Sequence, residues 1–192
     1  MKTLFLFLTQ TKGGTVVRDL NFQNILVDNK SIHVLDTNIF MNFLYILKWA
    51  EEEVIIIPRI VPWELKDIAK NIRKTSEERK QAREALNEIF RNNITEDKLI
   101  EGIHNHKKCY IFIRENKKNY FKINCPDHRI ISLAKDIQKM NNHGREVILL
   151  SHDYELRKKA KNKKVKAIKC GGDYFFKRNK EARVSIQQVA FA

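Results

Sequence analysis

The sequence predicts an α/β protein, a three-layer α/β/α sandwich in which helices cover both faces of a mostly parallel sheet of about five strands. Short β-branched runs, such as residues 54–57 and 147–150, alternate along the chain with longer polar stretches that carry apolar residues at helical spacing. The chain has 192 residues, of which 43% are hydrophobic, so one domain with a substantial core is expected.

The first two predicted strands each lead to an acidic residue. The apolar run of residues 32–35 ends at Asp36, so a strand that stops there places the Asp36 carboxylate at the carboxyl edge of the sheet. The second strand, residues 54–57, is followed by Pro62, which suits the first turn of a helix. Glu64 is therefore expected near a helix start.

The middle of the chain is dense in charge. Partial helical periodicity over residues 65–101 predicts two helices, with a break near Thr75 and Ser76. A further strand is expected at residues 109–113. The alternation of helix and strand therefore continues through this region.

Two more acids occupy comparable places in the second half of the chain. Asp127 follows Pro126 and precedes an apolar helical pattern, so it is expected in the first turn of a helix, where the helix dipole favours acids. The strand at residues 147–150 runs into Ser151 and Asp153 just before another predicted helix.

Four acidic residues thus stand where predicted strands give way to loops or helices: Asp36, Glu64, Asp127 and Asp153. In a parallel sheet these ends meet at one edge, which is where ligands bind. Crowded carboxylates repel one another unless a cation neutralises them, and an all-oxygen set favours Mg²⁺ or Mn²⁺. One or two such ions can activate water for phosphodiester hydrolysis. Taken singly, each acid is more typical of a helix cap, a turn or an exposed surface, and only their joint placement indicates a metal site.

Residues 34–41 read Val-Leu-Asp-Thr-Asn-Ile-Phe-Met, residues 56–65 run from Ile-Ile-Pro to Glu-Leu, and residues 150–160 run from Leu-Ser-His-Asp to Lys-Ala. In this order the segments resemble the motifs of the PIN-domain ribonucleases, especially the branch that includes PhoH-associated and eukaryotic messenger-RNA-surveillance PIN domains. Residues 126–130 depart from that branch, because they read Pro-Asp-His-Arg-Ile where Asn-Asp-Asp-Arg-Ile is common. His128 replaces the second acid, so a second metal ion is expected to bind weakly or to be absent if that acid helps to hold it.

The resemblance spans about residues 32–168 and implies which residues act. The implied metal-binding and catalytic acids are Asp36, Glu64, Asp127 and Asp153. The implied activity is endonucleolytic cleavage of single-stranded RNA by metal-activated water, with one or two Mg²⁺ or Mn²⁺ ions. Asn38 and Ser151 would orient the carboxylates or a metal-bound water, although both are equally typical of residues that cap turns.

Two alternatives remain beside this hypothesis. A catalytically weak PIN module could serve as an RNA-binding or protein-docking scaffold, which His128 mildly favours and the four retained acids oppose. A structure-specific nuclease acting on flapped DNA would use the same carboxylates, but it usually needs a longer chain with extra elements that grip DNA. Comparing RNA with DNA cleavage separates this DNA nuclease from the endoribonuclease.

The overall charge favours a polyanionic partner. The chain has 37 Lys and Arg against 23 Asp and Glu, a formal net charge of +14 at pH 7 and a pI near 9.7. Lysine-rich helical faces are also typical of ordinary solvated surfaces, so the net charge is firmer evidence than any one side chain. The candidate nucleic-acid-binding residues are Lys66, Arg73, Lys74 and Arg157.

Three segments are expected. Residues 1–30 form an N-terminal extension with a predicted β-hairpin, residues 31–170 form the PIN-like nuclease domain, and residues 171–192 form a tail that packs on the domain or on a partner. That partner is left open as a second copy of the chain or another protein.

The cysteines indicate a reducing compartment. Cys109, Cys125 and Cys170 are odd in number and widely spaced, which disfavours a disulfide scaffold and favours an intracellular protein of the cytoplasm or nucleus. The apolar residues 4–8 are too few to span a membrane and lack a following cleavage site, so neither secretion nor a membrane partner is expected.

Overall fold

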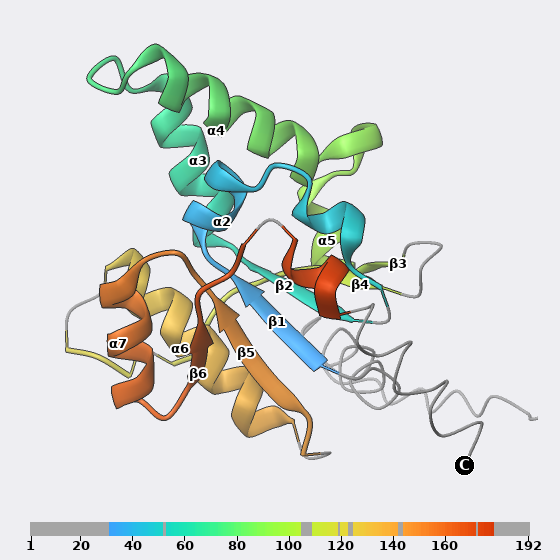
Figure 1. Ribbon diagram of the computed structural model, residues 1–192, viewed down its shortest axis with the longest axis vertical. Helices are drawn as coiled ribbons and strands as arrows, with labels where there is room; N and C mark the ends of the chain where they lie inside the picture. Colours follow the sequence, from blue (N-terminus) through green and yellow to red (C-terminus); the bar gives the residue numbers. More distant parts are fainter. Residues whose placement is uncertain are drawn as a thin grey trace, which may run out of the picture.

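The computed structural model describes residues 31–51, 53–104, 109–118, 120–122, 125–141, 144–171 and 173–178. The predicted hairpin of residues 1–30 and the tail beyond residue 178 lie outside the described residues. A six-stranded sheet with the order β3-β4-β2-β1-β5-β6 forms the centre, and helices flank it (Figure 1). The predicted α/β fold with a mostly parallel sheet is confirmed. The sheet has one strand more than the five expected, because a two-residue edge strand is too short to leave a pattern in the sequence.

The strands are β1 (Ser31–Leu35), β2 (Val54–Pro58), β3 (Ile103–His104), β4 (Tyr110–Arg114), β5 (Glu146–Leu150) and β6 (Lys166–Ile168). The α-helices are α2 (Thr37–Asn42), α3 (Ile60–Lys70), α4 (Ser76–Ile89), α5 (Glu96–Glu101), α6 (Pro126–Met140) and α7 (Tyr154–Asn162). Short 3-10 turns occur at η1 (Ile46–Trp49) and η2 (Arg91–Asn93), and residues 174–178 are also helical. No helix in the described ranges is long and apolar enough to cross a membrane.

The sheet is buried on both faces at its centre. β1 lies between β2 and β5, all three parallel, so that Ile32 pairs with Val54 on one side and with Val147 on the other. Every residue of β1 and β2 is buried, as are the last four of β5. A strand covered on both faces needs apolar side chains at nearly every position, which explains the continuous β-branched runs. Among the strands that the structure describes, only β3 pairs antiparallel, with β4.

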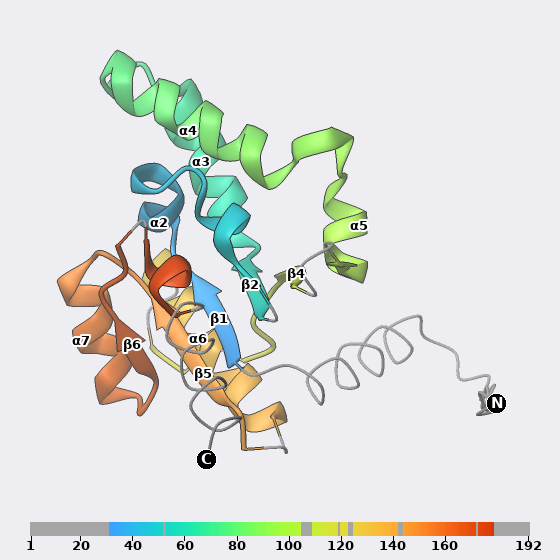
Figure 2. The ribbon, with the colours of Figure 1, turned by 45° about the vertical axis from the view of Figure 1, so that its right-hand side comes forward.

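Helices form the outer layers. α6 runs along one face of the sheet, while η1 and residues 174–178 lie over the other (Figures 1 and 2). α3 and α4 form a helical hairpin, so the predicted break near Thr75 is confirmed. Thr75 begins α4 with a capping box, in which its hydroxyl accepts from Glu78 N at 3.1 Å and its backbone N–H donates to the Glu78 carboxylate at 2.8 Å.

A buried polar network joins residues 174–178 to the start of β1. The fully buried His33 ring places Nε2 3.2 Å from the Tyr174 hydroxyl and Nδ1 3.6 Å from the Glu53 carboxylate. Arg178 donates to Glu53 at 2.7 Å and also to the Ser31 hydroxyl. Burial, helped by the positive charge of Arg178, lowers the pKa of His33 to about 3. The imidazole therefore stays neutral in the folded protein at ordinary pH.

This burial makes His33 a source of acid sensitivity. In the unfolded chain an imidazole has a pKa near 6.5. As pH falls from 6.5 towards 3, the unfolded chain binds a proton at His33 and the folded protein does not, so the free energy of unfolding decreases over this range. Between pH 7 and pH 5, the wild type should lose about 2 kcal/mol more unfolding free energy than His33→Gln. Urea unfolding at both pH values measures this difference.

His104→Gln is the matched control, because His104 is exposed on β3 and should keep the wild-type pH dependence. If the unfolding free energies of the wild type and His33→Gln changed equally with pH, the lowered pKa of His33 would be contradicted.

Candidate active site

Asp36 is fixed in place on both sides of its carboxylate. It follows β1, is 5% exposed and caps the start of α2, where its Oδ1 accepts from Thr37 N at 2.6 Å. The Ser151 hydroxyl donates to its other oxygen at 2.7 Å. Its backbone N–H donates to Leu150 O at 3.1 Å, which continues the pairing of β1 with β5 one residue past the end of β1. The carboxylate therefore has a single defined orientation.

Ser151 must donate rather than accept in this contact. A hydroxyl has one proton and two acceptor sites, and its acceptor sites face Asp153 N at 2.9 Å and the Asn38 amide nitrogen at 3.4 Å. Its proton is therefore left for Asp36. Asn38 also accepts from His152 N at 2.9 Å, so Asn38 and Ser151 together join the loops after β1 and β5. Ser151 thus both caps a turn and orients a carboxylate.

Glu64 approaches Asp36 from α3. Its carboxylate accepts a hydrogen bond from the hydroxyl of Thr37, the residue next to Asp36. The helix begins at Ile60, so Pro62 lies in its first turn and Glu64 lies near the helix start, as predicted. Proline is tolerated in that opening turn because its missing N–H would have had no helical partner.

Asp127 reaches the same region from the first turn of α6, where the sequence places it after Pro126. Lys159 of α7 donates to its carboxylate at 2.8 Å. This hydrogen bond is the main reason that the pKa of Lys159 is raised. The ammonium is therefore firmly charged and compensates Asp127 directly.

Three of the four acids act on one another electrically. Burial raises the pKa of the Asp36 carboxyl to about 6, the hydrogen bonds from Ser151 and Thr37 oppose this, and the charges of Glu64 and Asp127 add to it. Burial likewise raises the pKa of Glu64, with a further contribution from Asp127. We call Asp36, Glu64 and Asp127 the acidic cluster.

Asp153 lies at the margin of this cluster. It is exposed and caps α7, where its Oδ1 accepts from Glu155 N at 2.7 Å and from Leu156 N at 3.1 Å. Its charge adds a little to the raised pKa of Lys159, the residue that pairs with Asp127. The structure therefore brings three of the predicted acids together and uses the fourth as a helix cap beside them.

The donor set of this site suits a hard divalent cation. All four candidate side chains are carboxylates, and the buried Asp36 lies among charges of its own sign. Within the described ranges, no three Asp, Glu, His or Cys side chains converge into a ready-made metal site. Mg²⁺ keeps several of its waters and commonly binds through one or two carboxylates, so such convergence is not required.

The predicted nucleic-acid-binding residues have different surroundings. Lys66 is exposed and lines a cavity beside the acidic cluster. Arg73 and Lys74 are exposed between α3 and α4, where Lys74 pairs with Glu78 at 3.1 Å. Arg157 donates to Ser151 O at 3.0 Å, so it braces the loop that carries Ser151.

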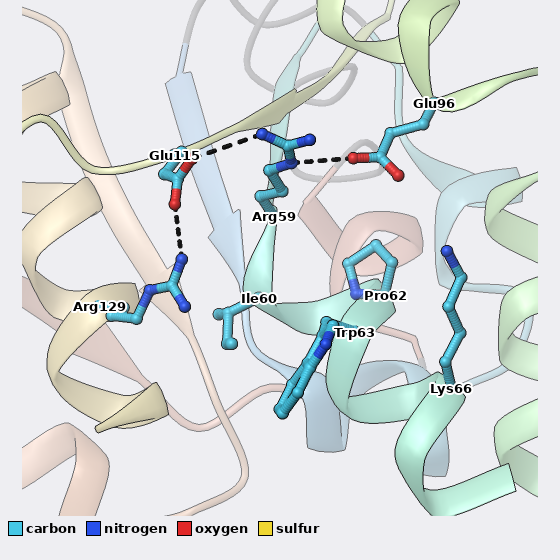
Figure 3. Close-up of a pocket in the computed structure, with 8 residues that line it drawn as sticks. All are labelled: Arg59, Ile60, Pro62, Trp63, Lys66, Glu96, Glu115 and Arg129. Carbon is cyan, nitrogen blue, oxygen red and sulfur yellow. Dashed lines mark hydrogen bonds and ion pairs between the residues drawn. The ribbon is translucent and has the colours of Figure 1, made fainter. Parts of the chain in front are cut away.

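Sequence reasoning missed several residues around the cluster. Lys159 stands in the last motif, within a basic run that could face RNA, and its ion pair with Asp127 is visible only in the structure. The cavity has a volume of about 330 Å³, and beside Lys66 its lining includes Arg59, Trp63, Glu115 and Arg129 (Figure 3). An exposed tryptophan directly before a candidate catalytic acid was the available signal in the sequence.

A family model described as PIN domain matches residues 33–170, which is most of the chain. The chain belongs to the PIN-domain family. A search of curated proteins found no match. Membership of the PIN-domain family generally implies metal-dependent nuclease activity on RNA, and PIN nucleases typically use divalent metals such as Mg²⁺ or Mn²⁺. The matched segment contains the acidic cluster and Asp153.

The acidic cluster should lower the stability of the metal-free protein. An ionised Asp36 is buried beside two other carboxylates, so we expect Asp36→Asn to raise the unfolding free energy by about 1–2 kcal/mol at pH 7.5 in EDTA. The gain should shrink as pH falls from about 6 towards 3.8, because Asp36 in the folded wild type then becomes neutral. Urea unfolding measures both effects.

Asp67→Asn removes the same charge from the exposed side of α3 and should leave stability nearly unchanged. A stability loss in Asp36→Asn would show that the hydrogen bonds to Asp36 outweigh burial and repulsion.

Proposed function

We propose that this PIN domain is a metal-dependent endoribonuclease that hydrolyses phosphodiester bonds of single-stranded RNA. The observation that carries the proposal is the buried Asp36 carboxylate, held by Ser151 and Thr37 next to Glu64 and Asp127 at the carboxyl edge of the sheet. Like charges placed so close together at a ligand-binding edge have a physical use only if a cation joins them. The motif order further supports the branch of PhoH-associated and messenger-RNA-surveillance PIN domains.

In this proposal, Asp36, Glu64, Asp127 and Asp153 hold one or two Mg²⁺ or Mn²⁺ ions. When bound, the metal supplies an activated water and stabilises charge on the phosphate that is attacked. The chain's own residues orient the carboxylates. Ser151 donates to Asp36 and Thr37 donates to Glu64, so both side chains are already ordered before an ion binds.

Lys159 gives the site a second source of positive charge. Its ammonium compensates Asp127 in the metal-free protein and lies beside the acids that a phosphate must approach. Together with the net charge of +14, it offsets the repulsion between the acidic cluster and an RNA strand. The basic surface therefore supports a polyanionic substrate even though the site itself is acidic.

The second candidate function is an RNA-binding or docking module with weak catalysis. His128, which stands where the family branch commonly has another acid, stacks on Phe121 with ring centroids 3.9 Å apart. Lys159 also occupies one side of Asp127. Both features reduce the carboxylate available to a second metal ion, which favours a single-ion site or a weak enzyme.

Cleavage of a labelled single-stranded RNA in Mn²⁺, Mg²⁺ and EDTA tests the proposal. We expect endonucleolytic fragments with either metal, none in EDTA, and a loss of at least about 100-fold in Asp36→Asn. The Asp67→Asn protein, purified identically, should cut like the wild type, and the loss in Asp36→Asn beside it excludes a contaminating nuclease. A DNA strand of the same sequence tests the flapped-DNA reading. Intact RNA in every lane, with RNA binding retained, would favour the docking module.

Ser151→Ala tests orientation of the Asp36 carboxylate. It should lower cleavage by about 10–100-fold and raise the Mn²⁺ concentration needed for half-maximal activity, because Asp36 loses the donor that orients it. RNA binding in EDTA should change little.

Ser132→Ala provides the matched control. Ser132, on α6, is also fully buried, but its hydroxyl accepts from Tyr120 N in the loop after β4. A Ser132→Ala protein with the same shift in Mn²⁺ dependence would mean that the effect of Ser151→Ala is general destabilisation.

A further inference from the structure

The cavity beside the acidic cluster has no role in the proposed chemistry. It lies between the start of α3, the end of β4, α5 and the start of α6, and its polar lining consists of Arg59, Trp63, Lys66, Glu96, Glu115 and Arg129 (Figure 3). Its volume of about 330 Å³ falls at the small end of the range of ligand pockets, which suits a single nucleotide.

Trp63 presents its ring to solvent at this cavity. It is 63% exposed, although its neighbours Val61 and Leu65 on α3 are fully buried. Figure 3 shows the ring between Arg129 on one side and Lys66 on the other. The next residue in the chain, Glu64, belongs to the acidic cluster. A large exposed aromatic face beside basic groups is the arrangement with which proteins stack single-stranded bases.

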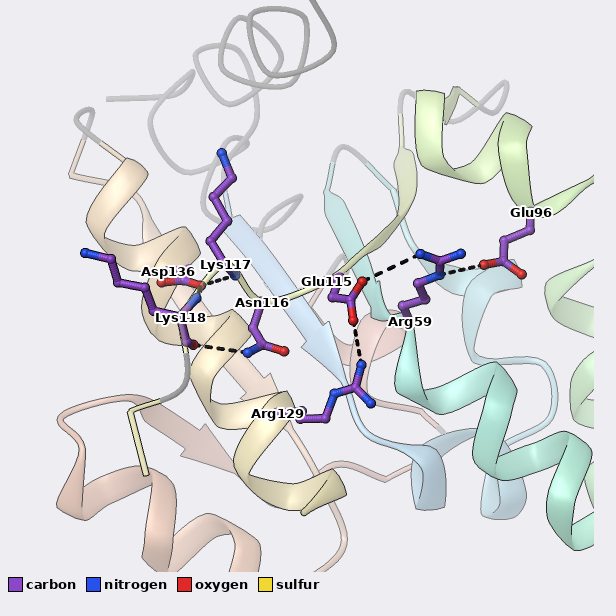
Figure 4. Close-up of polar contacts among 8 residues, drawn as sticks. All are labelled: Arg59, Glu96, Glu115, Asn116, Lys117, Lys118, Arg129 and Asp136. Carbon is purple, nitrogen blue, oxygen red and sulfur yellow. Dashed lines mark hydrogen bonds and ion pairs between the residues drawn. The ribbon is translucent and has the colours of Figure 1, made fainter. Parts of the chain in front are cut away.

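The charges of the lining are largely paired with one another. Glu115 accepts from Arg129 at 2.6 Å and lies 3.6 Å from Arg59, which donates to Glu96 at 2.9 Å (Figure 4). Three cations and two carboxylates leave an excess of one positive charge. A pocket for phosphate alone would present unpaired cations. This lining instead offers donors and acceptors at the edges of an aromatic face, which matches a nucleobase.

The wall of the cavity is anchored. The loop after β4 is held by Asp136 of α6, which is 6% exposed and accepts from Lys117 N at 2.7 Å and Lys118 N at 3.1 Å. The Tyr120 hydroxyl donates to the same carboxylate at 2.7 Å. Glu115 therefore projects from a fixed loop, and the arginines that it joins are preorganised.

The cavity and the acidic cluster draw on the same two helices: Trp63 and Glu64 are on α3, and Arg129 and Asp127 are on α6. Arg129 lies two residues after Asp127 in the first turns of α6. Burial raises the pKa of Glu64, and the positive charge of Arg129 partly opposes that rise. A ligand at Trp63 is thus next to the proposed reaction centre.

We infer that this cavity is a base-binding subsite, in which Trp63 stacks on one base of single-stranded RNA close to the bond that is cut, while Arg59 and Arg129 contact the edge of that base. The inference rests on the proposed nuclease function and adds a substrate-positioning residue to it. Lys66 contributes attraction for the backbone at the open side.

Tryptophan fluorescence tests this contact directly, since the chain has only two tryptophans, Trp49 and Trp63. In the full-length Trp49→Phe protein, Trp63 reports alone. Titration with a 12-nucleotide single-stranded RNA in EDTA should quench its emission. Trp63→Phe, in which only Trp49 reports, should bind this RNA without quenching, because Trp49 packs against Phe176 on another surface.

Abasic RNA identifies the ligand as a base. Removing the base at one particular position should weaken wild-type binding roughly tenfold, as expected for one lost stacking contact. Trp63→Ala should weaken binding of intact RNA to a similar extent and should be insensitive to the same base removal, because the two changes remove one interaction. Trp49→Ala should behave like the wild type.

The outcomes separate this subsite from the nuclease activity. RNA that binds without quenching Trp63, or abasic RNA that quenches as strongly as intact RNA at every position, overturns the subsite even if cleavage is observed. Base-dependent quenching without cleavage supports the subsite while the nuclease proposal fails. No RNA binding at all overturns both.

Discussion

The parallel pairing of β1 with β5 is the constraint on which the rest of the site depends. The register sets Leu35 opposite Leu150, so Asp36 and Ser151 emerge side by side at the carboxyl edge. The backbone bond from Asp36 N to Leu150 O and the hydroxyl bond from Ser151 both follow from that register. A slip of one residue would turn each side chain to the opposite face and remove both contacts.

At Asp36, the arrangement that suits the proposed function lowers the stability of the fold. Asp36 is removed from water and set among like charges, which costs folding free energy that an apolar residue would not. Donors from Thr37 and Ser151 recover part of that cost, and Lys159 compensates the neighbouring Asp127. A bound cation would recover more. The acidic cluster is thus a strained site supported by a large, fully buried sheet.

The cavity at Trp63 is also held in place by the surrounding fold, and we infer that it positions the substrate. Its polar groups come from α3, α5, α6 and the loop after β4, each held by contacts made elsewhere in the fold. Paired charges keep the lining ordered without making it strongly basic. A strand of RNA held there by one base would place its backbone near acids that would otherwise repel it.

The sequence by itself determined the buried strands, the position of acids at their ends and the family to which the chain belongs. These features are local: residues 54–57 are apolar throughout because both faces of β2 are covered, and a carboxylate after a strand is visible without any partner. Only the tertiary structure decided that Asp153 caps α7 at the margin of the cluster, that Lys159 pairs with Asp127 and that α3 begins at Ile60. It also decided the two-residue β3 and the cavity that joins Arg59, Glu115 and Arg129. These outcomes depend on side-chain orientation and on contacts between residues far apart in the chain, which no local pattern encodes.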